Sequence, residues 1–284
     1  HKSNLVRLGG IGIFLGIYIS ILILLNFPFA DFRNDYFLKS IFYFAPLFFF
    51  LGLIDDIYVL SPFIRLIFQF LLSVFVWNKG IQVDNLIFNV FGNVTSLELN
   101  STLSILFTFF WIVGMINAIN WMDGLDGLAS GIISISIIGL IIITISNGMN
   151  QYIYVLFSIL GACLAFLIYN VYPAKILMGD GGSYLLGFFA ASLSIYFTNL
   201  ESLVNNFNFL FIQVFLLFAV PIIDMVTVIF TRIKNGKSIF LPDRSHLHHR
   251  LIDLGFSHKD TVIMILAISQ LFASFSITLC LQRF

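Results

Sequence analysis

The chain has 284 residues, of which 60% are hydrophobic and only 10% are charged, and its formal net charge at pH 7 is zero. A soluble globular domain has about 25% charged residues, and no soluble core of this size could cover so much apolar surface. The composition therefore excludes a soluble fold, and the neutral charge excludes the basic footprint of a nucleic-acid-binding protein. We expect a membrane protein whose function depends on its few polar residues.

Apolar runs recur along the chain with lengths close to the roughly 17 to 25 residues that cross a bilayer as a helix. We therefore predict an all-α polytopic membrane protein that forms one domain over residues 1–284 and has about nine transmembrane helices. The predicted spans are residues 9–27, 40–54, 63–77, 102–119, 129–146, 152–169, 183–198, 209–230 and 261–281.

A different pattern lies between the third and fourth spans. Residues 81–90 and 94–99 alternate apolar, often β-branched side chains with polar ones, and Gly92 and Asn93 separate the two runs. This pattern is typical of two short strands joined by a tight turn. We predict a small β-hairpin over residues 81–99 on the surface of the membrane.

The positive residues predict the orientation of the chain. When the nine spans alternate, most of the Lys and Arg residues fall on one side, which is typical of the cytoplasmic side. The hairpin then faces outward. The same side collects the acidic pair after the second span, the polar segment after the fourth, a Gly-Asp segment and a histidine-containing loop over residues 231–260. We therefore predict a single cytoplasmic active site.

Asp55 and Asp56 end the second predicted span. Adjacent carboxylates repel each other unless a cation or a proton lies between them, so the pair could hold Mg²⁺ or a lysine, or act as a base. Acidic residues at membrane depth are costly and usually functional. The alternative is an ordinary solvated helix end.

Polar residues recur at every third position in the segment 117–128. On a continuing helix Asn117, Asn120 and Asp123 cover an arc of roughly 120° and can line one groove. Asp126 follows, glycines loosen the backbone there, and Asn and Asp oxygens are hard ligands of the kind that Mg²⁺ prefers. The alternative is a turn between two spans, stabilised by Asn, Asp and Gly.

The segment 178–183 reads Met-Gly-Asp-Gly-Gly-Ser and directly precedes a predicted span. It would present free backbone N–H groups at a helix N-terminus, where glycines permit a nest around phosphate oxygens. Asp180 could complete a metal site there. The alternative is that Ser183 simply caps the helix.

The loop between the last two spans combines three imidazoles with guanidinium groups, which suit contacts to phosphates and sugar hydroxyls. Its residues of interest are Arg244, His246, His248 and His249. A zinc site is a weaker interpretation, because the cluster lacks the partners and spacing of known zinc motifs. A solvated basic loop is the third interpretation.

Asp224 lies inside the eighth predicted span, where an unpaired carboxylate would be costly. We expect it to meet a positive partner that faces the interior of the bundle, such as Arg232 or Lys175.

Taken together, these motifs resemble the polyprenyl-phosphate N-acetylhexosamine-1-phosphate transferases, the family 4 glycosyltransferases of bacterial membranes. That family includes undecaprenyl-phosphate GlcNAc-1-phosphate transferase and phospho-MurNAc-pentapeptide transferase. The resemblance extends from the Arg-Leu-Gly-Gly segment at residues 7–10 to the last cytoplasmic loop. The His-Leu-His-His sequence at 246–249, preceded by Pro-Asp-Arg, is more similar to the GlcNAc branch than to the pentapeptide branch.

The resemblance implies ten or eleven transmembrane helices, so we expect that the first helix of the family precedes this chain. It also implies the reaction: transfer of N-acetylhexosamine 1-phosphate from a UDP-sugar, most simply UDP-GlcNAc, to undecaprenyl or another polyprenyl phosphate, with release of UMP. The enzyme would lie in the bacterial inner membrane and start the synthesis of a cell-envelope glycan. The resemblance to the family is also the one reason to expect a homodimer.

The family's motifs assign roles to residues of this chain. Asn120 and Asp180 match its metal-binding positions, for Mg²⁺ with Mn²⁺ as a substitute. Asp55, Asp56, Asp123 and Asp126 match its catalytic aspartates, with Asp55 as the candidate base. Residues that would bind substrate are Asn117, Arg244, His246, His248 and His249.

Two other functions are weaker alternatives. The first is the activity of phospho-MurNAc-pentapeptide transferase, which belongs to the same family. An ion-coupled transporter would use intramembrane acids and broken helices near the midplane, often with internal repeats, whereas here the polar motifs cluster on one side and no repeat is found. A non-catalytic membrane scaffold would not need the clustered aspartates.

Overall fold

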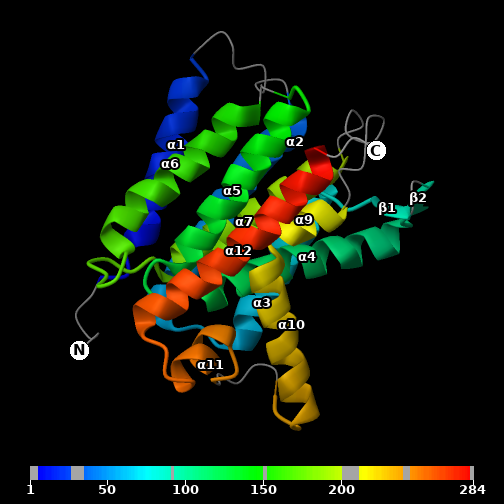
Figure 1. Ribbon diagram of the computed structural model, residues 1–284. Helices are drawn as coiled ribbons and strands as arrows, with labels where there is room; N and C mark the ends of the chain where they lie inside the picture. The colour runs from blue at the N-terminus through cyan, green and yellow to red at the C-terminus, as the bar shows by residue number, and fades with distance from the viewer. Residues whose placement is uncertain are drawn as a thin grey trace.

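The computed structural model describes residues 6–26, 35–90, 93–149, 152–199, 211–238 and 244–281. Most of this chain is helical, and the helices form one bundle (Figure 1). The helices are α1 (Gly9–Leu24), α2 (Tyr36–Tyr58), α3 (Pro62–Asn78), α4 (Ser101–Met122), α5 (Leu128–Ser146), α6 (Ile153–Asn170), α7 (Gly179–Asn199), α9 (Phe211–Leu217), α10 (Ala219–Lys234), α11 (Leu247–Asp253) and α12 (His258–Leu281).

Helix α7 is the centre of the bundle. It is buried along almost its whole length and packs against α1, α2 and α4. Small residues permit this packing: a Cβ atom on Gly187 would lie 2.6 Å from the Cα of Ile116, and one on Gly52 would lie 2.2 Å from the carbonyl oxygen of Asp180. Such approaches are open only to glycine. They bring the N-terminus of α7 directly against α2 and α4.

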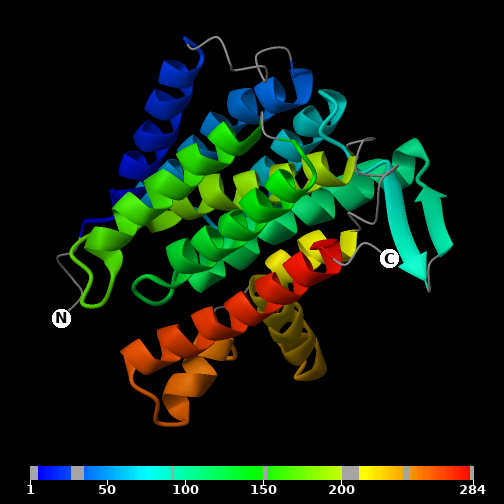
Figure 2. The same cartoon turned by 45° about the horizontal axis from the view of Figure 1, so that its top comes forward.

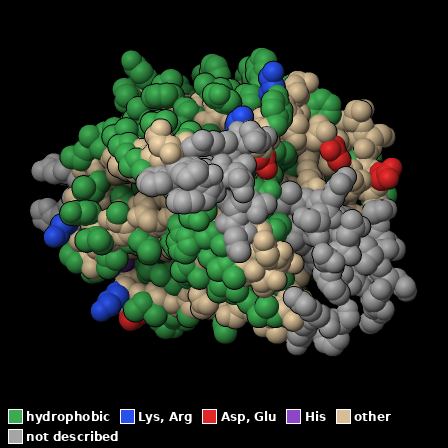
Figure 3. Space-filling model, turned by 90° about the horizontal axis from the view of Figure 1, so that it is seen from above, with side chains coloured by type: hydrophobic (Ala, Val, Ile, Leu, Met, Phe, Trp, Pro, Cys, Tyr) green, Lys and Arg blue, Asp and Glu red, His purple; other side chains and the backbone are tan. Residues whose placement is uncertain are grey.

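The outer surface of the bundle is apolar. Among the described residues, five helices are long and apolar enough to cross a membrane, namely α2, α4, α5, α6 and α12, and α1 and α3 are shorter apolar helices. Large hydrophobic side chains remain exposed on most of them, and hydrophobic side chains cover much of the surface in Figure 3, where charged ones are few. A protein with these helices is solvated by lipid. The chain is therefore a multi-pass membrane protein, although the expected number of nine spans stays a prediction.

The expected span over residues 209–230 is wrong as a single helix. Helix α9 ends at Leu217, and α10 begins at Ala219 after Phe218, whose φ and ψ are −111° and 20°. Pro221 lies in the first turn of α10, where the missing N–H breaks no helical hydrogen bond. In Figures 1 and 2 α10 projects from the bundle at an angle. The break turns one face of α10 toward α4.

The segment expected as a loop over residues 231–260 contains regular structure. Helix α10 continues to Lys234, α11 forms one short helix from Leu247 to Asp253, and α12 starts at His258. Helix α11 packs against α12. The histidines therefore lie on or next to a helix that is fixed to the bundle.

Strands β1 (Asn85–Val90) and β2 (Asn93–Glu98) pair antiparallel within the range of the predicted hairpin. The N–H of Val83 donates to Thr108 Oγ1 (2.8 Å), which ties the base of this sheet to α4. Figure 2 shows the two strands at the edge of the bundle. The side of the membrane on which they lie stays a prediction.

Candidate functional site

One pocket of about 810 Å³ opens between the start of α7 and helices α3, α4, α10 and α11. One part of its lining is apolar and comes mainly from α4 and α10. The other part is polar and contains carboxylate, amide, imidazole and guanidinium groups. The apolar residues include Leu66, Phe109, Phe110, Met225 and Ile229, and the polar ones are Arg7, Arg65, Asn117, Asn120, Asp123, Asp180, Arg232, His246, His248 and His249.

Helix α4 contributes three polar residues to the pocket from one face. Asn117 and Asn120 lie in its last turns, and Asp123 is the residue at which the helix ends. The sequence predicted this shared face from the spacing of three residues. Asn117 donates from Nδ2 to Gln69 Oε1 of α3 (2.9 Å). Gln69 is fully buried and was missed by the sequence reasoning, since its position resembles that of any polar residue in an apolar run.

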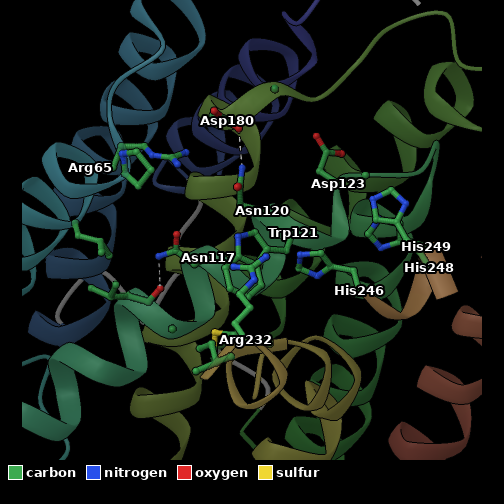
Figure 4. Close-up of a pocket in the computed structure, with 18 of the residues that line it drawn as sticks. Arg65, Asn117, Asn120, Trp121, Asp123, Asp180, Arg232, His246, His248 and His249 are labelled. Carbon is green, nitrogen blue, oxygen red and sulfur yellow. Dashed lines mark hydrogen bonds between the residues drawn. The ribbon is translucent and has the colours of Figure 1, made fainter. Parts of the chain in front are cut away.

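Asp180 lies in the first turn of α7, which starts at Gly179 and not at the expected residue 183. Asn120 Nδ2 donates to Asp180 Oδ1 (2.7 Å) and to Ser183 Oγ (2.9 Å), as Figure 4 shows for the first pair. Ser183 is therefore inside the helix and does not cap it. Two residues that the family resemblance assigns to one metal ion are thus joined by a hydrogen bond.

The segment 178–183 differs from the expected phosphate nest. Gly181 N–H donates to Asp56 Oδ2 (3.0 Å), so this backbone group is already used. Gly179 has φ of +78°, and a Cβ atom there would lie 2.7 Å from Asp56 Oδ2. Asp56 therefore holds the start of α7 and lies close to the pocket without lining it.

Asp55 is buried and has other partners than Asp56. It accepts hydrogen bonds from Arg65 Nη1 (3.1 Å), Tyr184 Oη (2.9 Å) and the N–H of Leu60 (2.8 Å). It is not among the residues that line the pocket, whereas Arg65 is. Each aspartate has an arginine near it: Arg65 Nη1 lies 3.1 Å from Asp55 Oδ2, and Arg7 Nη1 lies 3.9 Å from Asp56 Oδ1. A cation between the two aspartates stays a prediction. The sequence offers no signal that singles out Arg65 among the other positive residues.

Asp126 is also outside the pocket lining. Its Oδ2 accepts from the N–H of Ala174 (3.1 Å), and its own N–H donates to His258 Nε2 (3.1 Å). These bonds connect the end of α4 with the segment before α7 and with the start of α12. Asp126 therefore shapes the backbone around the site.

The three histidines form one cluster. His246 directly precedes α11, and the rings of His248 and His249 lie 4.3 Å apart between centroids. Burial lowers the pKa of His248 to about 4, with further lowering by His249 and His246, and burial also lowers the pKa of His249. In Figure 4 the cluster lies beside Asp123. Near neutral pH the imidazole of His248 is therefore uncharged.

Arg244 does not join this cluster. Its guanidinium is exposed and pairs with Asp253 (2.6 Å between Nη2 and Oδ1), and it is not among the residues that line the pocket. The guanidinium groups that do line it are those of Arg7, Arg65 and Arg232. Arg232 lies over the ring of Trp121, 5.2 Å from its centroid.

Asp224 has a different partner from the expected one. Its Oδ2 lies 2.9 Å from His246 Nδ1, and its Oδ1 accepts the N–H of Leu247 (2.6 Å). The expectation of an arginine or lysine failed because the break before α10 brings Asp224 against the start of α11.

The acidic groups of the pocket suit a divalent cation. Burial raises the pKa of the Asp123 carboxyl well above its ordinary value, and the carboxylates of Asp180 and Asp56 raise it further. Asp56 Oδ1 is buried and accepts no hydrogen bond from any described residue, and its ion pair with Arg7 Nη1 is long, at 3.9 Å. A bound cation would relieve this repulsion.

Within the described part of the chain, no group of three or more His, Cys, Asp or Glu residues could hold a metal ion by itself. Mg²⁺ does not require such a group, because it is usually bound by one or two carboxylates together with substrate phosphates and water. Asp123 and Asp180 therefore fit Mg²⁺ in the presence of a phosphate ligand.

Comparison with known proteins identifies the family. Residues 38–198, more than half of the chain, match the model of glycosyl transferase family 4. The chain belongs to glycosyl transferase family 4. The matched part contains Asp55, Asp123 and Asp180 but ends before the histidine cluster.

Relatives with assigned names cover nearly the whole chain of this family 4 protein. It is 33% identical over 98% of its length to a probable undecaprenyl-phosphate N-acetylglucosaminyl 1-phosphate transferase of Bacillus subtilis, and covers 74% of that protein. It is 31% identical over 93% of its length to a decaprenyl-phosphate N-acetylglucosaminephosphotransferase of Mycobacterium leprae, covering 71%. The undecaprenyl-phosphate alpha-N-acetylglucosaminyl 1-phosphate transferase of Haemophilus influenzae is 29% identical over 98% of this chain, and the match covers 76% of that protein.

Proposed function

We propose that this family 4 protein transfers N-acetylhexosamine 1-phosphate, most simply GlcNAc 1-phosphate, from a UDP-sugar to a polyprenyl phosphate and releases UMP. The observation that supports this most is one pocket that joins carboxylates, imidazoles and guanidinium groups to an apolar wall made mainly by α4 and α10. The nucleotide sugar needs the polar part of the pocket, and the chain of the lipid phosphate needs the apolar part. The names of the relatives favour transfer of GlcNAc 1-phosphate over transfer of phospho-MurNAc-pentapeptide.

The polar part would bind the diphosphate of the donor. We assign Asp180 and Asp123 as the residues that hold Mg²⁺, with Mn²⁺ as a substitute, and Asn120 as the residue that orients Asp180. When bound, the cation would neutralise the charge that develops on the transferred phosphoryl group. His246, His248 and His249 would contact the sugar and its diphosphate from the opposite helix.

The apolar part would receive the lipid acceptor. Phe110 and Ile229 belong to this wall, and Ile223, Val226 and Phe230 of α10 are exposed on the surface of the protein. A polyprenyl chain is as apolar as the bilayer, so it can lie against this surface at little cost. Its phosphate would then reach Arg65.

In the reaction, an oxygen of the lipid phosphate attacks the β-phosphorus of the UDP-sugar. A new P–O bond forms there, the bond from the β-phosphorus to the bridging oxygen breaks, and UMP leaves with that oxygen. A phosphate monoester is already largely ionised near neutral pH, with its second pKa at about 6. A base is therefore not required, and Asp55 acts by holding Arg65, because each of its oxygens already accepts hydrogen bonds.

We also propose the cytoplasmic side of a bacterial plasma membrane as the place of the reaction. The excess of positive residues on the side of the pocket supports this orientation. The donor nucleotide is a soluble molecule, and the polar part of the pocket lies at one end of the bundle where such a molecule can enter.

The direct test uses the full chain in detergent or liposomes and follows UMP release. UDP-GlcNAc, UDP-GalNAc and UDP-glucose are offered in turn with undecaprenyl phosphate and Mg²⁺. We expect UMP only when both a UDP-N-acetylhexosamine and the lipid phosphate are present, with UDP-GlcNAc as the best donor. Absence of UMP with every UDP-N-acetylhexosamine would exclude the proposed reaction.

A further inference from the structure

Asp224 and His246 form a buried pair next to the pocket. Their side chains belong to α10 and to the residue that precedes α11, and the two residues are 5% and 8% exposed. Asp224 Oδ2 lies 2.9 Å from His246 Nδ1, and Asp224 Oδ1 accepts the N–H of Leu247 (2.6 Å). Both carboxylate oxygens are therefore used by the same two neighbouring residues.

This contact determines which ring nitrogen of His246 carries a proton. A carboxylate oxygen can only accept a hydrogen bond, so the nitrogen that faces it is Nδ1–H. The ring also packs edge-on against Trp121, with 4.9 Å between centroids, which prevents it from turning freely. His246 lines the pocket. Nε2 is therefore the nitrogen that remains for a ligand, and in neutral imidazole it is an acceptor.

We propose that Asp224 is a positioning residue, which holds His246 so that Nε2 accepts a hydrogen bond from a hydroxyl or acetamido N–H group of the donor sugar. This inference rests on the proposed function. It assigns to Asp224 an effect on the donor that is transmitted only through His246. The alternative is that Asp224 merely anchors α11 through the N–H of Leu247.

Asp224→Asn separates these two roles. The amide oxygen of the new side chain still accepts the N–H of Leu247, but its NH₂ group faces His246 Nδ1. Nδ1 must then become an acceptor, and the proton moves to Nε2. We expect kcat/KM for the UDP-sugar to fall roughly 10- to 100-fold, by analogy with the loss found when the hydrogen-bond partner of a metal-ligating histidine is removed.

A double-mutant cycle with His246→Gln decides the question, because interacting residues give non-additive effects. If Asp224 acts through His246, Asp224→Asn changes kcat/KM less than about twofold when His246→Gln is already present. Asp260→Asn is the matched control, since it makes the same chemical change at an exposed carboxylate of α12 outside the pocket, and we expect wild-type kinetics. An equal loss from Asp224→Asn in both backgrounds would overturn the proposal.

Folding is checked by the unfolding temperature of each purified variant. If Asp224→Asn does not fold, the pair Asp224→Glu and Asp224→Gln makes the same comparison between a carboxylate and an amide. Higher activity of Asp224→Glu supports the proposal, and equal activity contradicts it. A wild-type protein that releases no UMP would overturn the proposed function and this inference together, whereas an active wild type with an additive cycle overturns the inference alone.

Discussion

Asp55 Oδ2 accepts a hydrogen bond from Arg65 Nη1 at 3.1 Å, and only the arginine of this pair lines the pocket. The side chain of Asp55 is 3% exposed and that of Arg65 is 28% exposed. Tyr184 Oη donates to the same carboxylate oxygen at 2.9 Å. The guanidinium is thus fixed at the wall of the pocket by a buried acid from the neighbouring helix.

Asp55→Asn should therefore lower activity by weakening the hold on Arg65. Hydrogen bonds to charged groups contribute about 1.5 to 3 kcal/mol, so UMP release should fall by roughly tenfold or more. The loss should appear mainly as a higher KM for the lipid phosphate. In an Arg65→Ala background Asp55→Asn should have little further effect, whereas a base at Asp55 would give an additional loss of kcat in that background.

Removal of the Asp180 carboxylate tests the assignment of the cation. Asp180→Asn should reduce UMP release on the order of 100-fold, because a metal ion contributes several kcal/mol to the stabilisation of transition-state charge. The Mg²⁺ concentration for half-maximal rate should rise. Chelation of the wild type should abolish activity, and Mg²⁺ or Mn²⁺ should restore it. Near wild-type turnover of Asp180→Asn would rule out its role in binding the metal, and Asp260→Asn is the control for a lost surface charge.

The parts of the site that could be predicted from the sequence depend on local spacing. Asn117, Asn120 and Asp123 share a face because residues three apart lie close together on any helix. The membrane location follows from composition alone. These properties need no knowledge of how helices pack.

The remaining features depend on tertiary contacts that leave little trace in local sequence. The break at Phe218 lies among apolar residues on both sides, so no change in hydropathy marks it. The pairing of Asp224 with His246 depends on this break. The different roles of Asp55 and Asp56 depend on α3 and α7, because Arg65 and Tyr184 both donate to Asp55, whereas the N–H of Gly181 donates to Asp56.

Gly124 should be required for the position of His248. A Cβ atom at Gly124 would lie 2.7 Å from His248 Nε2 and 3.1 Å from its Cε1, so the imidazole must move. Because displacement of a positioned group by about 1 Å can cost as much as 100-fold in rate, we expect Gly124→Ala to lower kcat/KM for the UDP-sugar on the order of tenfold. Gly12→Ala is the matched control, since its Cβ would meet no atom within 4 Å. Equal kinetics of the two variants would show that His248 tolerates the displacement or is not used.

His248 should also make the stability of the protein depend on pH. Burial lowers the pKa of His248 to about 4, whereas an unfolded histidine titrates at about 6.5. Between these values the unfolded chain binds a proton that the folded protein does not, so stability falls as the pH falls through this window. The loss at pH 5 is about 2 kcal/mol.

His248→Gln removes this titration, and the fall of the unfolding temperature between pH 7 and pH 5 should become smaller than in the wild type. The measurement is thermal unfolding of the full chain in detergent, followed by intrinsic fluorescence. His249→Gln serves as the comparison, and it should have a smaller effect because His249 is less buried than His248. If all three proteins lose the same stability on acidification, the buried imidazole of His248 is not the group responsible.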